Sequence, residues 1–256
     1  MRSIADRWLA SIPSFRETSF RVATLRSDLA RLDLAELGEA LEEIARAAEQ
    51  ADARAREVLT AFAPTFADPD VEETIVALRQ LAQERRYFAL ARLLRRRDRP
   101  SPHHAPEPEE RGTIDLPGRT LTLGERKSLA RGHDRDQLDR LLRDPHPLVI
   151  KNLLSNPRIT EEDVIRLAAK RPTYPDVQAE IGRSERWSIR PRVRLALAKN
   201  PYTPVPLSVP LLPLLLRQEL AEIAHATELP GVVRAAAMDL LDRRPPVPAD
   251  EDPGEH

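Results

Sequence analysis

One arginine-rich stretch, GRSERWSIRPRVRLALAK at positions 182–199, holds the side chains best suited to chemistry. It carries six basic residues and one acidic residue around a single tryptophan. Basic groups on one face of a helical array can grip phosphates, and an indole ring can stack on a base or on a protein partner. The candidate binding residues are Arg183, Arg186, Trp187, Arg190, Arg192, Arg194 and Lys199.

The same stretch also has a plainer structural interpretation. Arginines on helices commonly point to solvent and pair with neighbouring acids, and a tryptophan commonly fills a gap between helices. The charge excess is local, because the net charge of the whole chain is −1. The overall composition is therefore not that of a polycation built for nucleic acid, and it favours the plainer interpretation.

No other set of side chains has the spacing of a catalytic or metal site. The six histidines include no pair four residues apart that could share one helix face around a metal. The chain has no cysteine, which excludes disulfides, thiolate catalysis and cysteine-bound zinc. The sequence also lacks a glycine-rich phosphate loop and a serine in a nucleophile turn. We therefore expect no metal, no cofactor and no enzymatic activity.

Composition indicates a protein that folds around an aliphatic core. Hydrophobic residues make up 41% of the 256 residues and aromatic residues only 4%. The start of the chain has no apolar run typical of a secretory signal. The longest apolar stretch, VPLSVPLLPLLL at 205–216, contains three prolines and is shorter than the roughly 20 residues that a bilayer requires. We expect a cytoplasmic protein, with residues 205–216 either buried in the core or exposed as a groove for a partner helix.

The positions of proline-rich stretches divide the chain. Residues 98–119 are rich in proline and poor in large apolar side chains, which predicts a flexible, disordered linker. Residues 244–256 have the same character and predict a disordered tail. Residues 1–97 and 120–243 lie on either side of the linker, contain few glycines and lack sustained alternation, so an all-α fold is expected for both.

The first part contains an apolar stripe with steps of three and four from Leu34 to Phe62. This heptad pattern predicts one helix of about 30 residues, roughly 45 Å long, with Asp33 as its N-cap. Further helices are expected at about 14–32 and 70–97. The economical arrangement is an antiparallel helical hairpin or small bundle, and the alternative is a coiled-coil homodimer through the 34–62 helix.

The second part repeats one phrase: the end of an apolar helix, a Gly or Asn, a short turn, a polar cap and a new helix. Gly132, Asn156 and Asn200 occupy the same place in the phrase. Gly and Asn tolerate the left-handed backbone that closes many helices, which is the role expected here. The expected caps are Thr122 with Glu125 as a capping box, then Asp134, Asp144, Thr160 and Thr203. About nine short helices in stacked pairs, an α-solenoid, would explain the repetition. The 44 residues from Asn156 to Asn200 are expected to span about two of these pairs.

The repeated segments resemble the bacterial leucine-rich repeat variant and other HEAT-like α-helical repeats. The units of these proteins commonly have the form DP-x-P-x-V-R followed by A-x-NP-x-TP. The matching residues are Asp144, Pro145, Pro147, Val149, Asn156, Pro157 and Thr160, then Pro191, Val193, Arg194, Asn200, Pro201, Thr203 and Pro204. The resemblance covers the second part only and implies a curved scaffold that binds other macromolecules. The cysteine cluster of some family members has no counterpart here.

Two functional hypotheses follow from the sequence. The first is a non-enzymatic scaffold or adaptor that binds a protein partner through its repeats, with the first part as a second contact or a self-association element. The alternative is a nucleic-acid-binding repeat protein that uses the basic stretch at 183–199. The two differ in whether binding weakens steeply with salt, as phosphate contacts require.

Overall fold

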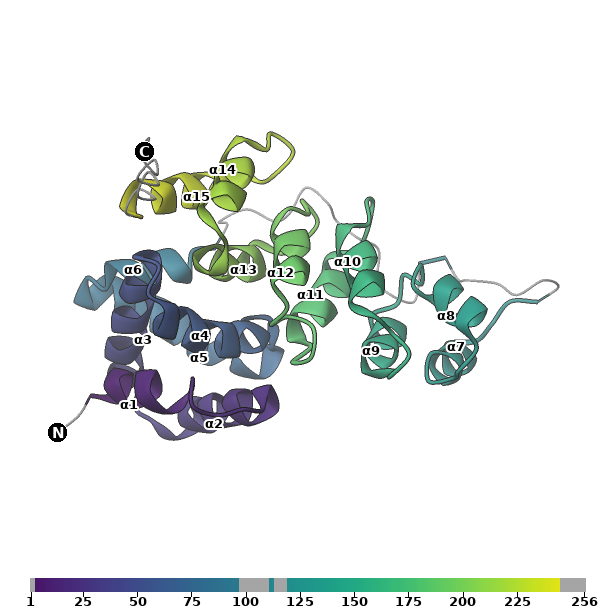
Figure 1. The fold of residues 1–256 in the computed structure, drawn as a ribbon, viewed down its shortest axis with the longest axis horizontal. Coiled ribbons are helices and arrows are strands. Elements are labelled where there is room, and N and C mark those ends of the chain that lie inside the picture. Colours follow the sequence, from purple (N-terminus) through teal and green to yellow (C-terminus); the bar gives the residue numbers. More distant parts are fainter. Residues whose placement is uncertain (1–2, 97–110, 113–118, 245–256) are drawn as a thin grey trace, which may run out of the picture.

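A computed structural model describes residues 3–96, 111–112 and 119–244, and its regular elements are helices (Figure 1). The first part forms a small helical bundle. Its elements are α1 (Ile4–Ser11), α2 (Thr18–Arg31), α3 (Leu34–Glu49), α4 (Ala53–Phe62), η1 (Ala63–Ala67), η2 (Pro69–Val71), α5 (Glu72–Arg85) and α6 (Phe88–Leu93). The expectation of an all-α fold is therefore met in the described ranges.

The second part is a row of short helices. They are α7 (Leu123–Leu129), α8 (Arg135–Leu141), α9 (Pro147–Ser155), α10 (Glu161–Ala169), α11 (Pro175–Arg183), α12 (Pro191–Ala198), α13 (Val205–Leu211), η4 (Leu212–Leu214), α14 (Arg217–His225) and α15 (Gly231–Arg243). Within 119–244 these include nine α-helices, as the sequence predicts. In Figure 1, α7, α9 and α11 lie on one side of the row, and α8, α10 and α12 on the other. Contacts of α9 with α7 and α11, and of α10 with α12, support this layering, which is consistent with a helical solenoid.

Asn156, in the second of the three repeated phrases, connects neighbouring helices of one layer. Asn156 follows α9, and its Nδ2 donates to the carbonyl oxygens of Ala130 (2.9 Å) and Gly132 (2.8 Å), just beyond the end of α7. Its Oδ1 accepts the N–H of Arg158 (2.9 Å). One amide thus satisfies two carbonyls that the end of a helix leaves without intrahelical partners.

Asn200 makes the equivalent bonds in the other layer. Its Nδ2 donates to the carbonyl oxygens of Ala168 (2.7 Å) and Lys170 (2.9 Å) at the end of α10, and its Oδ1 accepts the N–H of Tyr202 (3.0 Å). The repeated phrase therefore marks the same side-chain function, although Asn156 ends a helix of one layer and Asn200 a helix of the other.

Two details of the sequence interpretation need correction. Asn156 has an extended backbone with φ −74°, so its side-chain bonds, and not a left-handed conformation, explain its place. The phrase at 200 comes three helices after the phrase at 156, namely α10, α11 and α12. The spacing of 44 residues is therefore one and a half helix pairs, and not two.

Most of the predicted caps are present. Thr122 and Glu125 form a reciprocal capping box, and so do Thr160 and Asp163. Asp134 accepts the first N–H groups of α8. Two predictions are wrong: Thr203 lies before the N-cap residue of α13, and Asp144 lies before that of α9. Asp144 is instead buried in an ion pair.

The capping box at the start of α10 leads to a prediction about acid stability. The Asp163 side chain is 1% exposed, and hydrogen bonds from the Arg135 guanidinium are the main cause that holds the pKa of its carboxyl well below the ordinary value of about 4. Such a carboxylate stabilises the fold above its unfolded pKa, and this stabilisation is lost as the pH falls. We expect Asp163→Asn to cost about 1–3 kcal/mol at neutral pH and progressively less below about pH 4.

Urea denaturation followed by circular dichroism at neutral and acidic pH measures this difference. Asp139→Asn is the matched control, because its carboxylate also pairs with Arg135 (2.7 Å) but is 43% exposed. We expect the control to change the unfolding free energy by less than about 1 kcal/mol at either pH. An Asp163→Asn penalty of the same size at both pH values would contradict the argument.

The apolar stripe of the first part does not lie on one helix. Ala51 has a left-handed backbone (φ 64°), and Asp52 caps a new helix by accepting the N–H of Ala55 (2.8 Å). The expected 34–62 helix is therefore divided into α3 and α4, which pack against each other. The stripe residues Leu37 and Leu41 are at most 2% exposed, so the chain itself covers the seam that the coiled-coil homodimer would use.

The expected 70–97 helix is divided in the same way, within the described residues. Arg86 has a left-handed backbone (φ 58°) and ends α5, and the separate helix α6 begins at Phe88. The sequence near residue 86 has neither glycine nor proline, so no residue that commonly ends a helix predicts this break. An antiparallel hairpin is thus too simple a description of the first part.

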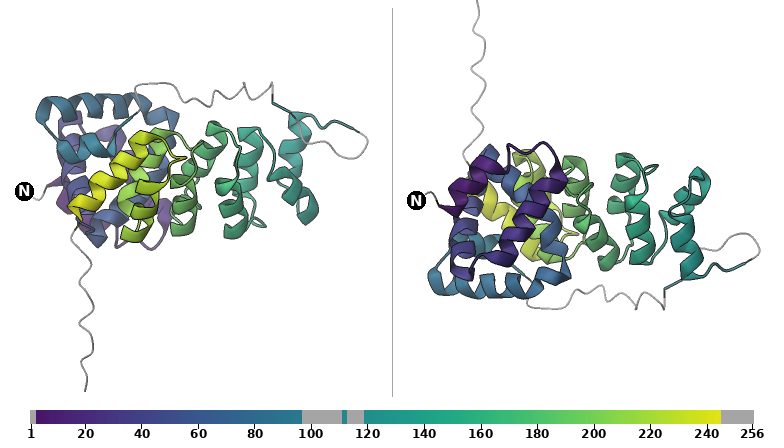
Figure 2. Two further views of the ribbon diagram at one scale, coloured as in Figure 1. Left: turned by 90° about the horizontal axis from the view of Figure 1, so that it is seen from above. Right: turned by 90° about the horizontal axis from the view of Figure 1, so that it is seen from below.

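The bundle and the row of helices as far as η4 share one hydrophobic core, and a second, smaller cluster of buried residues joins α13, α14 and α15. η1 of the bundle packs on α11 and α13, and a single cluster of buried residues extends from Ala5 to Leu214. Most of residues 205–215 belong to the buried core, as the first of the two interpretations held. Figure 2 shows the row extending away from the bundle, with the teal helices farthest. The two parts are therefore packed against each other, in addition to being joined by the segment that the sequence predicts to be a flexible linker.

Residues 98–110 and 113–118 of the predicted linker, and 245–256 of the predicted tail, lie outside the described residues. Arg111, within the linker range, is 8% exposed. Its guanidinium pairs with Asp176 (2.7 Å) and lies 4.0 Å from the centre of the Tyr174 ring. At this position the segment is docked on α11, because ionic and cation–π contacts hold the side chain.

Candidate binding groove at the junction of the two parts

A groove of about 620 Å³ lies where the bundle meets the row of helices. In Figure 1, α11 lies between α2 of the bundle and α9 of the row. We define the junction groove by its lining residues, which are Arg26, Asp68, Pro69, Asp70, Lys151, Leu154, Ser155, Glu180, Arg183, Ser184, Glu185 and Arg186. Two of the basic residues singled out in the sequence, Arg183 and Arg186, are among them.

An ion pair connects the two walls of the junction groove. Arg26 on α2 donates to Asp68 (3.1 Å) in the bundle and to Glu185 (3.4 Å) in the loop after α11. Lys151 on α9 is exposed, and its ammonium has no carboxylate within 4.0 Å in the described chain. The groove therefore presents one cation that makes no direct ion pair in the described chain, although its charge acts on the Glu180 carboxyl.

Arg183 holds the floor of the groove to the bundle. Its Nε donates to the carbonyl oxygen of Ala67 (2.5 Å), and its Nη1 donates to Glu180 (2.5 Å). Burial is the main cause that raises the pKa of the Glu180 carboxyl, although the Arg183 charge opposes it. Both groups are thus engaged within the protein, and their role is to fix α11 against η1.

Arg186 and Trp187 form a stacked pair with different exposure. The Arg186 guanidinium lies 4.3 Å from the ring centre of Trp187 and donates to the carbonyl oxygens of Asn156 (3.2 Å) and Ile159 (3.4 Å). Trp187 is 3% exposed, and its Nε1 donates to the Leu154 carbonyl (2.8 Å). The indole is therefore buried and bonded to α9, and its faces are not open to a nucleic-acid base.

The remaining candidates do not gather beside these residues. Arg190 is exposed, and no acid of the described chain pairs with it. Arg192 pairs with Glu162 at the start of α10 (3.1 Å). Lys199 pairs with Glu222 on α14 (2.6 Å), and Arg194 is 7% exposed inside the fold. The basic stretch is therefore distributed over several environments and does not form one continuous face.

The bundle supplies groove residues that the sequence interpretation missed. Arg26, Asp68 and Asp70 are single charged residues without a motif, and Lys151 and Glu180 stand in ordinary amphipathic helices. Their proximity depends on the packing of η1 against α11, which joins residues more than a hundred positions apart. No local signal in the sequence indicates this contact.

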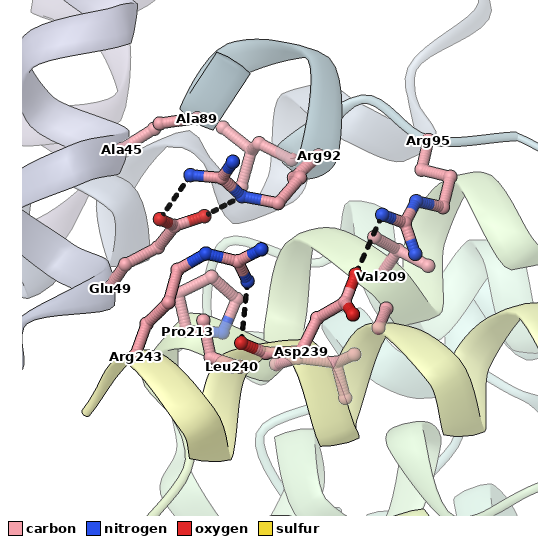
Figure 3. Close-up of a pocket in the computed structure, with 13 residues that line it drawn as sticks. Ala45, Glu49, Ala89, Arg92, Arg95, Val209, Pro213, Asp239, Leu240 and Arg243 are labelled. Atoms are coloured by element: carbon pink, nitrogen blue, oxygen red, sulfur yellow. Dashed lines mark hydrogen bonds and ion pairs between the residues drawn. The ribbon is translucent and has the colours of Figure 1, made fainter.

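A second cavity lies where α3 and α6 meet α13, η4 and α15. Figure 3 shows Arg92 bonded to Glu49 and Arg95 bonded to Asp239 along its walls. Its volume of about 20 Å³ is about the space that one water molecule needs. We interpret it as a packing junction between the bundle and the last helix, because a cavity of this size cannot hold a larger ligand.

Two kinds of feature are absent from the described ranges. No group of three His, Cys, Asp or Glu side chains could hold a metal ion there. Among the helices of those ranges, none has the length and apolar character to span a membrane.

No family model matches this chain. The searches of curated proteins and of solved structures also returned no match. The resemblance to leucine-rich repeat variant and HEAT-like proteins therefore depends on the repeated phrases, the layered helices and the bonds of Asn156 and Asn200. What the comparisons and the structure support together is an all-helical fold compatible with a helical repeat.

Proposed function

We propose that this protein is a non-enzymatic helical-repeat scaffold, of the HEAT-like or leucine-rich repeat variant kind, that binds a segment of a protein partner in the junction groove. The observation that carries the proposal is the groove itself, about 620 Å³ in volume and lined by both parts of the chain. A concave site of this size accepts a few side chains of a partner, and ligand sites are common where two packed units meet.

The charge of the groove suggests the chemistry of the partner segment. Lys151 makes no direct ion pair in the described chain, whereas Arg26 and Arg183 are already bonded to acids of the chain. An acidic side chain of the partner would pair with Lys151, and the exposed Pro69 offers apolar contact beside it. Aliphatic contact with one charge pair is a common composition for a specific, transient interface.

Affinity capture from the source cells tests this proposal, with quantitative mass spectrometry of the bound proteins. Lys151→Glu reverses the free charge, and Ser155→Trp fills the groove without altering a charge. We expect at least one protein to be captured roughly tenfold less by both variants, the change that about 1.4 kcal/mol of binding free energy produces.

Lys127→Glu is the matched control, because Lys127 lies on α7, outside the groove. We expect this variant to capture the same protein as the wild type. A set of bound proteins that is identical for the wild type, Lys151→Glu and Ser155→Trp would contradict the proposal.

Nucleic-acid binding is the second candidate function, and the exposure of Arg190 and Arg192 supports it. Fluorescence anisotropy with labelled DNA and RNA at low and high salt tests it, because phosphate contacts make affinity fall steeply with salt. Arg190→Ala combined with Arg192→Ala would weaken such binding and reduce its salt dependence. Affinity that these substitutions do not change would exclude this surface.

A further inference from the structure

The outward face of α15, the last described helix of the row, is exposed and apolar at its centre. The helix packs on α13 and α14 through the buried side chains Val233, Ala237 and Leu240. On its other side Met238 is 47% exposed, Ala235 is exposed and Leu241 is half-buried. The left view of Figure 2 shows this helix, in yellow, on the surface of the molecule. The last helix of a stacked array normally presents a polar outer face to water, and α15 departs from this rule.

Two charged residues lie at equal distances from Met238. Arg234 precedes it by four residues, and Asp242 follows it by four. Neither side chain forms an ion pair in the described chain, and the enclosed Nε of Arg234 has no hydrogen-bond partner there. Asp239, by contrast, already pairs with Arg95 (2.9 Å). Eight residues of helix separate Arg234 from Asp242 by about 12 Å along the axis, which is too far for a direct ion pair within one chain.

The order of these residues along the helix is self-complementary. We call Arg234, Ala235, Met238, Leu241 and Asp242 the α15 face, and their positions are symmetric about Met238. When two copies of the helix lie antiparallel with a twofold axis at Met238, Arg234 of each copy lies opposite Asp242 of the other. Ala235 and Leu241 lie opposite each other in the same way, a small side chain against a large one. A twofold interface requires such a surface, because the same residues form both of its halves.

We propose that the α15 face forms a twofold, antiparallel contact between two copies of this chain. The two Met238 side chains pack at its centre, and two ion pairs between Arg234 and Asp242 close its ends. Because α15 has 13 residues and is about 20 Å long, the contact is small and the dimer is weak and reversible. The α15 face shares no residue with the junction groove, so this contact is independent of the function proposed above.

Analytical ultracentrifugation of the full chain tests the proposal at concentrations from about 1 μM to about 1 mM, the range of weak complexes. We expect the mass of the wild type to rise from that of a monomer towards that of a dimer. Met238→Asp should raise the dissociation constant by about tenfold or more, because it buries a carboxylate without a partner. Leu148→Asp is the matched control, because Leu148 is 42% exposed on α9, outside the α15 face. This control should dimerise like the wild type.

Reversal of the two charges tests the antiparallel arrangement. Arg234→Asp places two acids opposite each other, and Asp242→Arg places two bases opposite each other, so each should weaken the dimer by about tenfold. The double variant restores both ion pairs with their signs exchanged, and we expect its association to return towards that of the wild type. A role of either residue within one chain would not produce this recovery.

Circular dichroism confirms that each variant is folded before its association is compared. A double variant that associates no more strongly than the single variants would overturn the proposal, and so would equal association of Met238→Asp and Leu148→Asp. A wild type that stays monomeric at every concentration would also overturn it. Loss of a captured protein in Met238→Asp would in that case assign the α15 face to a different partner.

Discussion

Replacing Asp144 by alanine is expected to lower the unfolding free energy by about 3–5 kcal/mol. Its side chain is fully buried and pairs with Arg126 (2.7 and 2.8 Å), which is itself 7% exposed. Asp144 also accepts the N–H of His146 (2.9 Å) in the turn before α9. Removing the carboxylate leaves the Arg126 guanidinium charged and unpaired in the core. An unpaired buried charge lowers the unfolding free energy far more than the loss of a whole buried ion pair does. Urea denaturation followed by circular dichroism measures the loss.

The double variant Arg126→Met, Asp144→Asn is the control for this argument. Asparagine keeps an acceptor for His146, and methionine replaces the guanidinium with an apolar chain of similar length. Because no charge is then left buried alone, the double variant should be more stable than Asp144→Ala. A cost below about 1 kcal/mol for Asp144→Ala would show that water solvates Arg126, and would contradict the buried pair.

The second large effect is expected at the two asparagines of the repeated phrase. Asn156→Ala leaves the carbonyls of Ala130 and Gly132 without a donor in a site where Asn156 is 4% exposed. Each unsatisfied buried group costs about 1–3 kcal/mol, so we expect a loss of about 2–4 kcal/mol. Asn200→Ala should cost a similar amount, because its two carbonyl bonds have the same form.

Asn152→Ala provides the matched control on the same helix as the first of these residues. Asn152 accepts bonds from Arg131 (3.1 and 3.2 Å) at the surface, so its loss should cost less than about 0.5 kcal/mol. Thermal unfolding and urea denaturation both measure these differences. Equal costs for Asn152→Ala and Asn156→Ala would mean that the repeated asparagine is only a turn residue.

Local chemistry made much of the second part predictable. The Thr122–Glu125 box, the Asp134 cap and the Thr160 cap each depend on residues within one turn, and the sequence alone identifies them. The number of helices in the second part follows from the same cap residues and from the Gly, Asn and Pro residues between the helices. Asp144 shows the limit of this reasoning: its position suits a cap, but Arg126, 18 residues earlier, determines its role.

The first part was harder to predict, because two of its breaks, at Ala51 and Arg86, have no glycine or proline nearby. Ala51 and Arg86 adopt left-handed backbones that alanine and arginine rarely favour, and the packing of α3 against α4, α5 and α6 stabilises them. The apolar stripe correctly identifies buried side chains such as Ile44 and Phe62. It does not reveal that the helix between them is interrupted.

The junction groove could not be predicted from spacing. Arg26 and Glu185 are separated by 159 positions, and their pairing depends on how the bundle docks on α11. The same is true of Arg56, which reaches carbonyls 158 and 159 positions away. The proposed binding in the junction groove therefore depends on the contact between the two parts of the chain.

The two tryptophans test that central claim directly, because each part contains one of them. Trp8 packs edge-on against Phe62 in the bundle (5.3 Å between ring centres), and Trp187 follows α11 and is bonded to α9. Trp187→Phe leaves a fluorescence probe in the bundle only, and Trp8→Phe leaves one in the row of helices only. Urea unfolding of each variant is followed by fluorescence and by circular dichroism on the same samples.

If the two parts share one core, fluorescence and circular dichroism give the same midpoint and slope within each variant. Both parts then unfold in one transition, and the junction groove is a fixed feature of the protein. Two separated transitions, with the Trp8 and Trp187 signals changing at different urea concentrations, would contradict this account.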